Sequence, residues 1–526
     1  MQINTKRITL VFIAHVIFFI LIVLGILPRI VTPFFTIIIA LYVLGVSLAE
    51  GTLFFVQSIP LFIALSVPGY TDSLNMWRII SIVIFLKWFG NSWRNLWVSL
   101  LGFIRKPFLF VKQHPTLGLC LGLLVMAFLS IIVASRPIVS LLRVILFVNL
   151  SFIGIVVYDL LKKNQYYINH LIRAIGISVI VVTLAGFVQL IFIYFIDIYG
   201  FVRIWGAGVQ CRQFGDHWCF IALYKGNTWF AYYGDQLTLR MFSLFPDSHS
   251  FPIYVLLGLP ALLAWSLELI PFHRFREAIW VRTRLLIVFV PLGLLAAILS
   301  GTRGIWAAWV GVGIFTIGLL WYSKRKSISK LALNILKYVS IFVPIFLMLF
   351  VIAYPIFDSP QFQSPARAGR LSGRLRSIAN FGETSNAQRI AIWKASISSI
   401  AKRPFLGVGI ANFPVILDQD VSLTKAGSSA HNLYIHIAAE MGLIALVIAL
   451  LYLLQLIRSA WKNFADSQNS IGPLYFAGIL IFVPWVLLYL LTDIALFDER
   501  AFLLFTVTSA IIFGYHASSR KSQSFS

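Results

Sequence analysis

Charged side chains are scarce in this sequence. Only 11% of the 526 residues are Asp, Glu, Lys or Arg, against about 25% in ordinary soluble proteins, and 60% are hydrophobic. The mean hydropathy is +0.91. A soluble protein this apolar cannot cover its surface with polar groups, which excludes a cytosolic enzyme, a disordered chain or a nucleic-acid-binding domain as the main interpretation. The composition predicts an all-α polytopic membrane protein.

Acidic residues and cysteines are also few. The sequence has 18 Asp and Glu residues and 42 Lys and Arg residues, which gives a net charge of +24. The basic residues lie mostly between apolar runs, as in membrane proteins. The only cysteines are Cys120, Cys211 and Cys219, too few for a disulfide scaffold or a Cys-ligated metal site. A disulfide between Cys211 and Cys219 requires an extracytoplasmic loop, and the sequence leaves this pairing open.

Apolar runs long enough to cross a bilayer fill most of the chain. A span takes roughly 20 residues of helix, and on this basis we predict about 12 to 14 spans. The lower count leaves out the runs at residues 51–67 and 76–90. The others lie at residues 8–27, 31–48, 117–134, 138–158, 171–196, 248–269, 284–300, 303–322, 333–356, 432–457, 473–492 and 501–516.

The basic residues predict the orientation of these spans. Every second connection is rich in Lys and Arg, beginning with Lys6 and Arg7, whereas the alternate short connections carry only Arg29, Arg136 and Arg500. The positive-inside rule then places both termini in the cytoplasm. Two long polar stretches, residues 197–247 and 357–430, fall on the outer face.

We accordingly divide the chain into three parts: an N-terminal bundle at residues 1–247, a central region at 248–458 and C-terminal spans at 459–526.

The larger outer loop, at residues 357–430, is basic. Its cations form either a solvated face or an anion site, and arginine suits phosphate because its planar fork donates paired hydrogen bonds. The sequence NAQRIAIWKASISSIAK at residues 386–402 predicts an amphipathic helix with Ile390, Trp393, Ile397 and Ile400 on its apolar face. The cations of the loop are Arg367, Arg370, Arg374, Arg376, Arg389, Lys394, Lys402, Arg403 and Lys425.

Several motifs in this region resemble a known family. They are RIAIW at residues 389–393, PFLGVG at 404–409, HNLY at 431–434 with EMG at 440–442, and SGTRG at 300–304. Their order and membrane placement resemble those of the O-antigen ligase and O-antigen polymerase superfamily between about Arg240 and Ile448. The resemblance implies a GT-C-like glycosyltransferase that takes a glycan from a polyprenyl-pyrophosphate carrier on the outer face of the bacterial inner membrane. Three branches share the motifs: ligases acting on lipid A–core, polymerases, and protein-glycosylating enzymes.

His431 is the candidate catalytic residue. It lies at the outer mouth of a span, and an imidazole can take the proton of an acceptor hydroxyl at neutral pH; the resemblance assigns this role to the matching histidine. Asn432 either orients His431 or caps the helix, and capping is favoured. Glu440, one helical turn after His436, is a supporting residue within a buried network.

Three arginines are candidates for binding the pyrophosphate. Arg303 lies at the membrane boundary, where a charge is costly and suggests function, although a snorkelling arginine is the plain alternative. The resemblance ties an arginine near Arg240 to the same group, but the family often has Pro-Asn where this chain has PDSH at residues 246–249. His249 in this segment is either a second acid/base group or a residue that starts a helix, and the latter is favoured. Arg389 either binds the donor or fixes the loop helix.

No metal and no cofactor are expected, and the partners are the lipid bilayer, the lipid-linked glycan and a lipid or glycan acceptor, with no nucleic acid. Asp418 and Asp420 form a rival metal-binding pair, but two carboxylates at this spacing are common by chance. The alternative class is a transporter or lipid flippase, which would place ionisable residues near the bilayer midplane and often show inverted repeats. The sequence shows neither feature.

Overall fold

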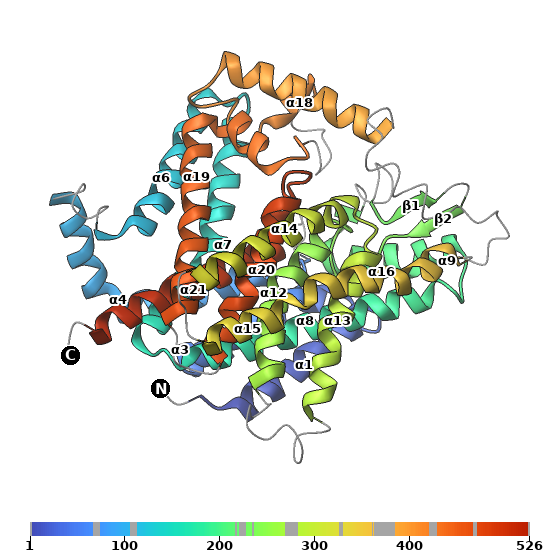
Figure 1. The fold of residues 1–526 in the computed structure, drawn as a ribbon, viewed down its shortest axis with the longest axis horizontal. Helices are drawn as coiled ribbons and strands as arrows, with labels where there is room; N and C mark the ends of the chain where they lie inside the picture. Colours follow the sequence, from blue (N-terminus) through green and yellow to red (C-terminus); the bar gives the residue numbers. More distant parts are fainter. Residues whose placement is uncertain are drawn as a thin grey trace.

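The computed structural model describes residues 3–66, 74–105, 113–215, 218–219, 228–233, 236–268, 282–325, 330–359, 361, 384–419, 429–466 and 471–523. These ranges are almost entirely helical (Figure 1). The long helices are α1 (Thr5–Val23), α2 (Thr32–Gly45), α3 (Leu48–Ser58), α4 (Met76–Arg105), α6 (Pro115–Ser130), α7 (Pro137–Lys163), α8 (Tyr167–Phe192), α12 (Ser250–Glu268), α13 (Arg282–Leu299), α14 (Arg303–Arg325), α15 (Lys330–Ser340), α16 (Phe342–Asp358), α18 (Thr384–Lys402), α19 (Leu433–Asp466), α20 (Ile471–Tyr489) and α21 (Glu499–Gln523).

The helices confirm an all-α polytopic membrane protein. Within the described ranges nine helices are long and apolar enough to cross a bilayer, and three shorter apolar helices cover residues 29–45, 48–61 and 288–299. Each predicted run contains a helix. The run at 333–356 differs in detail, because it is divided into α15 and α16 at Ile341. Pro344, in the first turn of α16, has no N–H to bond to the carbonyl four residues earlier, which allows the break there.

Two helices form the centre of the bundle. In α12 and α20, 89% of the spanning window is buried, as expected of helices that are apolar on every side. They pack against each other, and α12 also contacts α8 and α13. Because lipid does not reach them, the segment before α12 and the segment after α20 are held firmly. Both segments carry polar residues of the candidate site.

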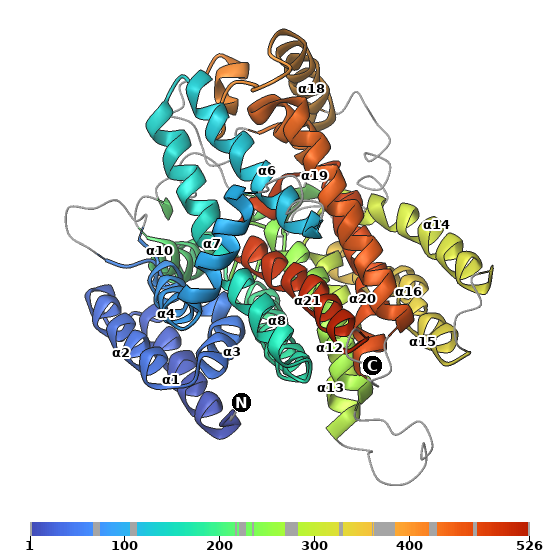
Figure 2. The same cartoon turned by 90° about the vertical axis from the view of Figure 1, so that its left-hand side faces the viewer.

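One end of the molecule is covered by α18. Figures 1 and 2 both show α18 lying across the top, above the ends of α6, α7 and α19. Below α18, the residues that follow it are fixed to the first turn of α7 and to the residue before it: Ser140 Oγ donates to Ile410 O at 2.6 Å, and the Arg136 amide donates to Asn412 Oδ1 at 2.9 Å. We call this the α18 end of the bundle.

The smaller polar stretch, residues 197–247, also folds. It contains α9 (Ile198–Phe201), a π-helix at Val202–Gln210, α10 (Cys211–Phe214) and an antiparallel hairpin of β1 (Phe230–Tyr233) and β2 (Gln236–Leu239). Cys211 and Cys219 form a disulfide, which resolves the pairing that the sequence left open. The hairpin is a small β element in a chain expected to be all helical.

Candidate functional site

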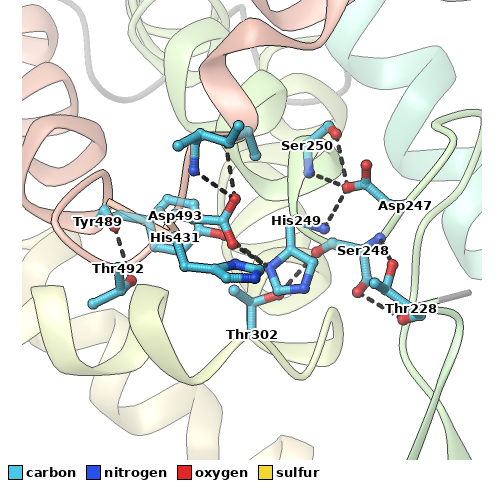
Figure 3. Close-up of polar contacts among 12 residues, drawn as sticks. Thr228, Asp247, Ser248, His249, Ser250, Thr302, His431, Tyr489, Thr492 and Asp493 are labelled. Carbon is cyan, nitrogen blue, oxygen red and sulfur yellow. Dashed lines mark hydrogen bonds and ion pairs between the residues drawn. The ribbon is translucent and has the colours of Figure 1, made fainter. Parts of the chain in front are cut away.

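Asp493, just beyond the end of α20, is the acidic centre of a polar cluster at this end of the central helices (Figure 3). Its Oδ1 accepts hydrogen bonds from the amides of Ile494 (2.8 Å) and Ala495 (3.0 Å). Its Oδ2 lies 3.0 Å from Nδ1 of His249. Burial opposes ionisation of Asp493, but His249, His431 and Arg389 outweigh it and hold the pKa below the usual carboxyl value. Asp493 is therefore a buried carboxylate.

His249 lies just before α12 and connects this carboxylate to an arginine. Its Nδ1 is also 3.2 Å from the Tyr489 hydroxyl, and its Nε2 is 3.4 Å from Arg240 Nη2. Its backbone amide donates to Asp247 Oδ1 at 2.8 Å, so the residue lies in the turn that leads into the helix, close to the expected helix start. The side chain, however, lies within the cluster, which the sequence reading did not favour.

Arg240 is held by three oxygen or nitrogen atoms. Its Nε donates to Ser300 O and its Nη2 to Thr302 Oγ1, both at 3.2 Å, in addition to the contact with His249. Thr302 Oγ1 in turn donates to Ser248 O at 2.8 Å. These bonds join Arg240, the start of α12 and the turn between α13 and α14 in one polar unit.

The turn at residues 300–304 depends on two glycines. Gly301 adopts φ 62°, a left-handed conformation that glycine adopts at low cost. A Cβ on Gly304 would lie 2.1 Å from Thr492 Oγ1, so only glycine lets α14 approach the segment that carries Asp493. Arg303 lies between Thr302 and Gly304, each of which contacts the cluster, and it is half-buried. The turn therefore places Arg303 beside the site.

The backbone at His431 is held in an unfavourable conformation. Its φ is 45°, which costs a non-glycine residue about 1–3 kcal/mol and is common at functional sites. Trp393 Nε1 of α18 donates to Ala430 O at 2.8 Å, and the Leu433 amide donates to Leu490 O at 2.8 Å. Asn432 Oδ1 accepts from the amides of residues 434 and 435 at 3.0 and 3.1 Å, which confirms it as the cap of α19.

The side chain of His431 lies beside Asp493 and His249. Figure 3 shows both imidazoles next to the carboxylate. Burial lowers the pKa of His431; Asp493 acts in the opposite sense, and the Arg389 guanidinium lowers it further. Its Nδ1 is buried without a hydrogen-bond partner among the described residues. A lowered pKa leaves the imidazole neutral at pH 7 and able to accept a proton.

Glu440 supports the site indirectly. Its Oε1 accepts from the Phe413 amide at 3.1 Å and its Oε2 lies 3.5 Å from His436 Nε2, so the buried network expected there is present. The helix α19 is interrupted two residues later, where Gly442 has φ 87°. The segment 404–409 fills this interruption: the Val408 amide donates to Ala439 O at 2.9 Å.

The loop helix is rotated from the expected phase. Of the four residues predicted to form the apolar face, Ile400 packs inward and Trp393 donates its hydrogen bond to Ala430 O, but Ile397 is 58% exposed. Ile392 packs inward with Ile400 and Phe413. Four apolar residues at three- and four-residue steps define a helix face only to within part of a turn. Arg389, on this helix, is half-buried and its charge acts on both His431 and Asp493.

Some predicted residues lie outside the described ranges. These include Arg367, Arg370, Arg374, Arg376, Lys425 and Asp420. Among the residues that the structure does describe, no three His, Cys, Asp or Glu side chains are grouped as a metal site. The absence of a metal stays a prediction.

Three features of the site were not identified from the sequence: Asp493, Tyr489 and the hydrogen bond of Trp393. Asp493 had a signal: it follows an apolar run directly, where a charge is costly and needs a partner. No local pattern pairs it with a histidine before α12. Only the packing of α12 on α20 brings the two together.

Comparison with known proteins gives one family. A model described as O-antigen ligase matches residues 286–450, from within α13 to within α19. No curated protein matches the chain. The matched region includes Arg303, Arg389 and His431, whereas Arg240, His249 and Asp493 lie outside it.

Proposed function

We propose, starting from the O-antigen ligase domain that this membrane protein carries at residues 286–450, that the chain is an inner-membrane glycosyltransferase of the ligase type. It moves a glycan from a polyprenyl-pyrophosphate carrier to a hydroxyl of lipid A–core on the periplasmic face. The observation that carries this proposal is the cluster in which His431, Asp493 and Arg240 converge at one end of the central helices. The domain alone supports a membrane enzyme that transfers glycans.

His431 is the general base in this proposal. Its lowered pKa keeps it neutral, so it accepts the proton of the acceptor hydroxyl as that oxygen bonds to the anomeric carbon. The bond from that carbon to the pyrophosphate oxygen breaks, and its electron pair leaves with the pyrophosphate. Attack opposite the leaving group inverts the anomeric configuration.

Arginines receive the leaving group. Arg240 bonds to the turn at residues 300–304, Arg303 is part of that turn, and the charge of Arg389 acts on the same cluster. Guanidinium groups donate paired hydrogen bonds to phosphate oxygens and stabilise the charge that develops on them. In this proposal the arginines supply the positive charge, and no metal takes part.

The position of the site also bears on the alternative function, a transporter or lipid flippase. A transporter is expected to hold its ionisable cluster near the midplane of the bilayer. Here the cluster lies where α12 and α14 begin and α20 ends. A site at the ends of spans fits an enzyme that works at the membrane surface.

The test is transfer by the purified full-length protein. We expect it to attach a lipid-linked glycan to lipid A–core, and His431→Ala to lose at least about 100-fold in rate, the usual contribution of a general base. His114→Ala, at an exposed histidine, is the matched control and retains activity. Free glycan polymer as the product would instead indicate a polymerase, and full activity of His431→Ala would refute the proposed base.

A further inference from the structure

His249 is a second imidazole in the cluster that the mechanism above does not use. It stands between Asp493 and Arg240, and both of its ring nitrogens have a partner. Nδ1 lies 3.0 Å from Asp493 Oδ2 and 3.2 Å from the Tyr489 hydroxyl, while Nε2 lies 3.4 Å from Arg240 Nη2. A lone helix-start histidine would need none of these contacts.

The partners determine which ring nitrogen carries the hydrogen. A carboxylate only accepts hydrogen bonds, so the Nδ1 that faces Asp493 carries the hydrogen. A guanidinium only donates, so the Nε2 that faces Arg240 carries the lone pair. The neutral imidazole therefore satisfies the hydrogen bonding of Asp493 and Arg240 together. Because the carboxylate is fixed, it orients His249, and His249 orients Arg240.

We propose that neutral His249 is a positioning residue that orients Arg240 toward the pyrophosphate, and that protonation of its Nε2 releases that arginine. The inference rests on the proposed function, in which Arg240 binds the leaving group. A proton on Nε2 sets an N–H against the N–H of Arg240 and a positive charge against a positive charge. Arg240 then loses His249 as a partner while it keeps its bonds to Ser300 O and Thr302 Oγ1.

Acid should therefore weaken binding of the pyrophosphate. Among the described residues, the charged or titratable groups that face His249 are Asp493 and Tyr489 from the α20 side, Arg240, His431, and Asp247 in its own turn. Of these, His431 is a second imidazole, and its own protonation would obscure the effect; an unperturbed imidazole changes charge between about pH 5 and 8. If protonated His249 were itself a phosphate ligand, acid would strengthen binding instead.

The experiment measures binding of inorganic pyrophosphate to the full-length protein from pH 5.5 to 8, with His431→Ala as the background. To it we add either His249→Gln or His249→Phe. Glutamine keeps an acceptor for Arg240 and a donor for Asp493 at every pH, and its profile includes the titration of pyrophosphate itself. Phenylalanine removes both. Unfolding temperatures of all three proteins show whether each is folded.

We expect the background protein to match the Gln variant at pH 8 and to bind about 10-fold more weakly than it at pH 5.5, as for one lost hydrogen bond to a charged group. The Phe variant, if folded, binds weakly throughout. Identical pH profiles for the background and the Gln variant, or tighter binding of the background at pH 5.5, would overturn the role of His249 alone. No binding of pyrophosphate by the background protein at any pH would overturn the proposed function as well.

Discussion

At the scale of single residues, Asp493 is central because it is buried and charged and has several partners at once. Two backbone amides hold one oxygen, and His249 faces the other. A buried carboxylate whose partners are removed is costly, so the surrounding histidines and the carboxylate stabilise one another. A depressed pKa means that this stabilisation persists above the usual carboxyl range and is lost only as pH falls through the lowered value.

Asp493→Asn tests this charge. Asparagine preserves the oxygen that accepts from the two amides but removes the negative charge beside both imidazoles. We expect glycan transfer to fall by about 100-fold. Because wild-type Asp493 stays ionised in mild acid, the acid limb of the rate between pH 5 and 8 should reflect histidine and not this carboxyl. Rates of the purified variant across pH provide the measurement, with the exposed Asp466→Asn as the control. Unchanged transfer in Asp493→Asn would contradict the role.

Asp498 behaves in the opposite way. Its Oδ1 caps α21 by accepting from the amides of Arg500 and Ala501, at 3.0 and 3.1 Å. Burial raises its pKa from 3.8 to about 7, against the pull of Arg500. The folded protein thus retains a proton that the unfolded chain releases, so this contribution to stability is complete below pH 4 and is lost as pH rises to about 7.

Asp498→Asn should remove this loss of stability at neutral pH. The amide oxygen preserves the cap and nothing remains to titrate, so the unfolding temperature of the variant should exceed that of wild type by several degrees at pH 7.5 and approach it at pH 4. Thermal unfolding in detergent at a series of pH values measures the difference. Parallel curves for the two proteins would show that the buried carboxyl is already ionised.

Single residues also show how far a sequence can be read. His431 and Arg303 lie in short motifs with glycines or helix starts around them, and such local context is visible in one dimension. Asp493 and His249 come from segments on opposite sides of that motif region, and their pairing depends on two buried helices lying together. No spacing along the chain encodes this contact.

At the scale of elements, α18 and the interruption in α19 act as one structure. The segment 404–409 enters the gap at Gly442, where the Leu443 amide donates to Pro404 O at 2.7 Å, and α18 reaches back through Trp393 to the carbonyl before His431. The loop therefore braces the residue that we propose as the base. The sequence predicted the helix at 386–402 from its periodicity, but not its rotation or the break, because both depend on what packs against them.

Gly442→Ala tests the brace. The φ of 87° strains any residue with a side chain, and a Cβ would lie 2.0 Å from Phe405 O, so the segment must shift. We expect a loss of about 1–3 kcal/mol in stability and a slower transfer rate. Gly313→Ala is the control, because an added Cβ there meets nothing within 4 Å and alanine favours a helix. If Gly442→Ala unfolds at the wild-type temperature, the brace is not needed for folding.

At the scale of the whole molecule, one end differs from the other in chemistry. The α18 end contains the loop helix, and Trp393 of this helix bonds to Ala430 O, directly before His431 of the polar cluster. The helices that begin there, such as α7 and α14, end in Lys162 and Lys163 or in Lys324 and Arg325. The sequence supports a sidedness for this arrangement through its basic residues, since cytoplasmic connections collect Lys and Arg.

Labelling of single cysteines tests the sidedness. The background replaces the exposed Cys120 by serine, and the disulfide keeps the other two cysteines unreactive. Ser398→Cys, exposed on α18, should react with a membrane-impermeant maleimide in intact spheroplasts. Lys324→Cys, exposed at the far end of α14, should react only after the membrane is permeabilised.

The labelling result decides where the reaction can occur. Reaction of Ser398→Cys from outside places α18, and with it His431 and the arginines, on the face where a periplasmic acceptor is available. Permeabilisation provides the internal control, because both cysteines must then react if both are accessible. The reverse pattern would orient the cluster toward the cytoplasm, and transfer to lipid A–core on the periplasmic face would then be impossible however well the residues are arranged.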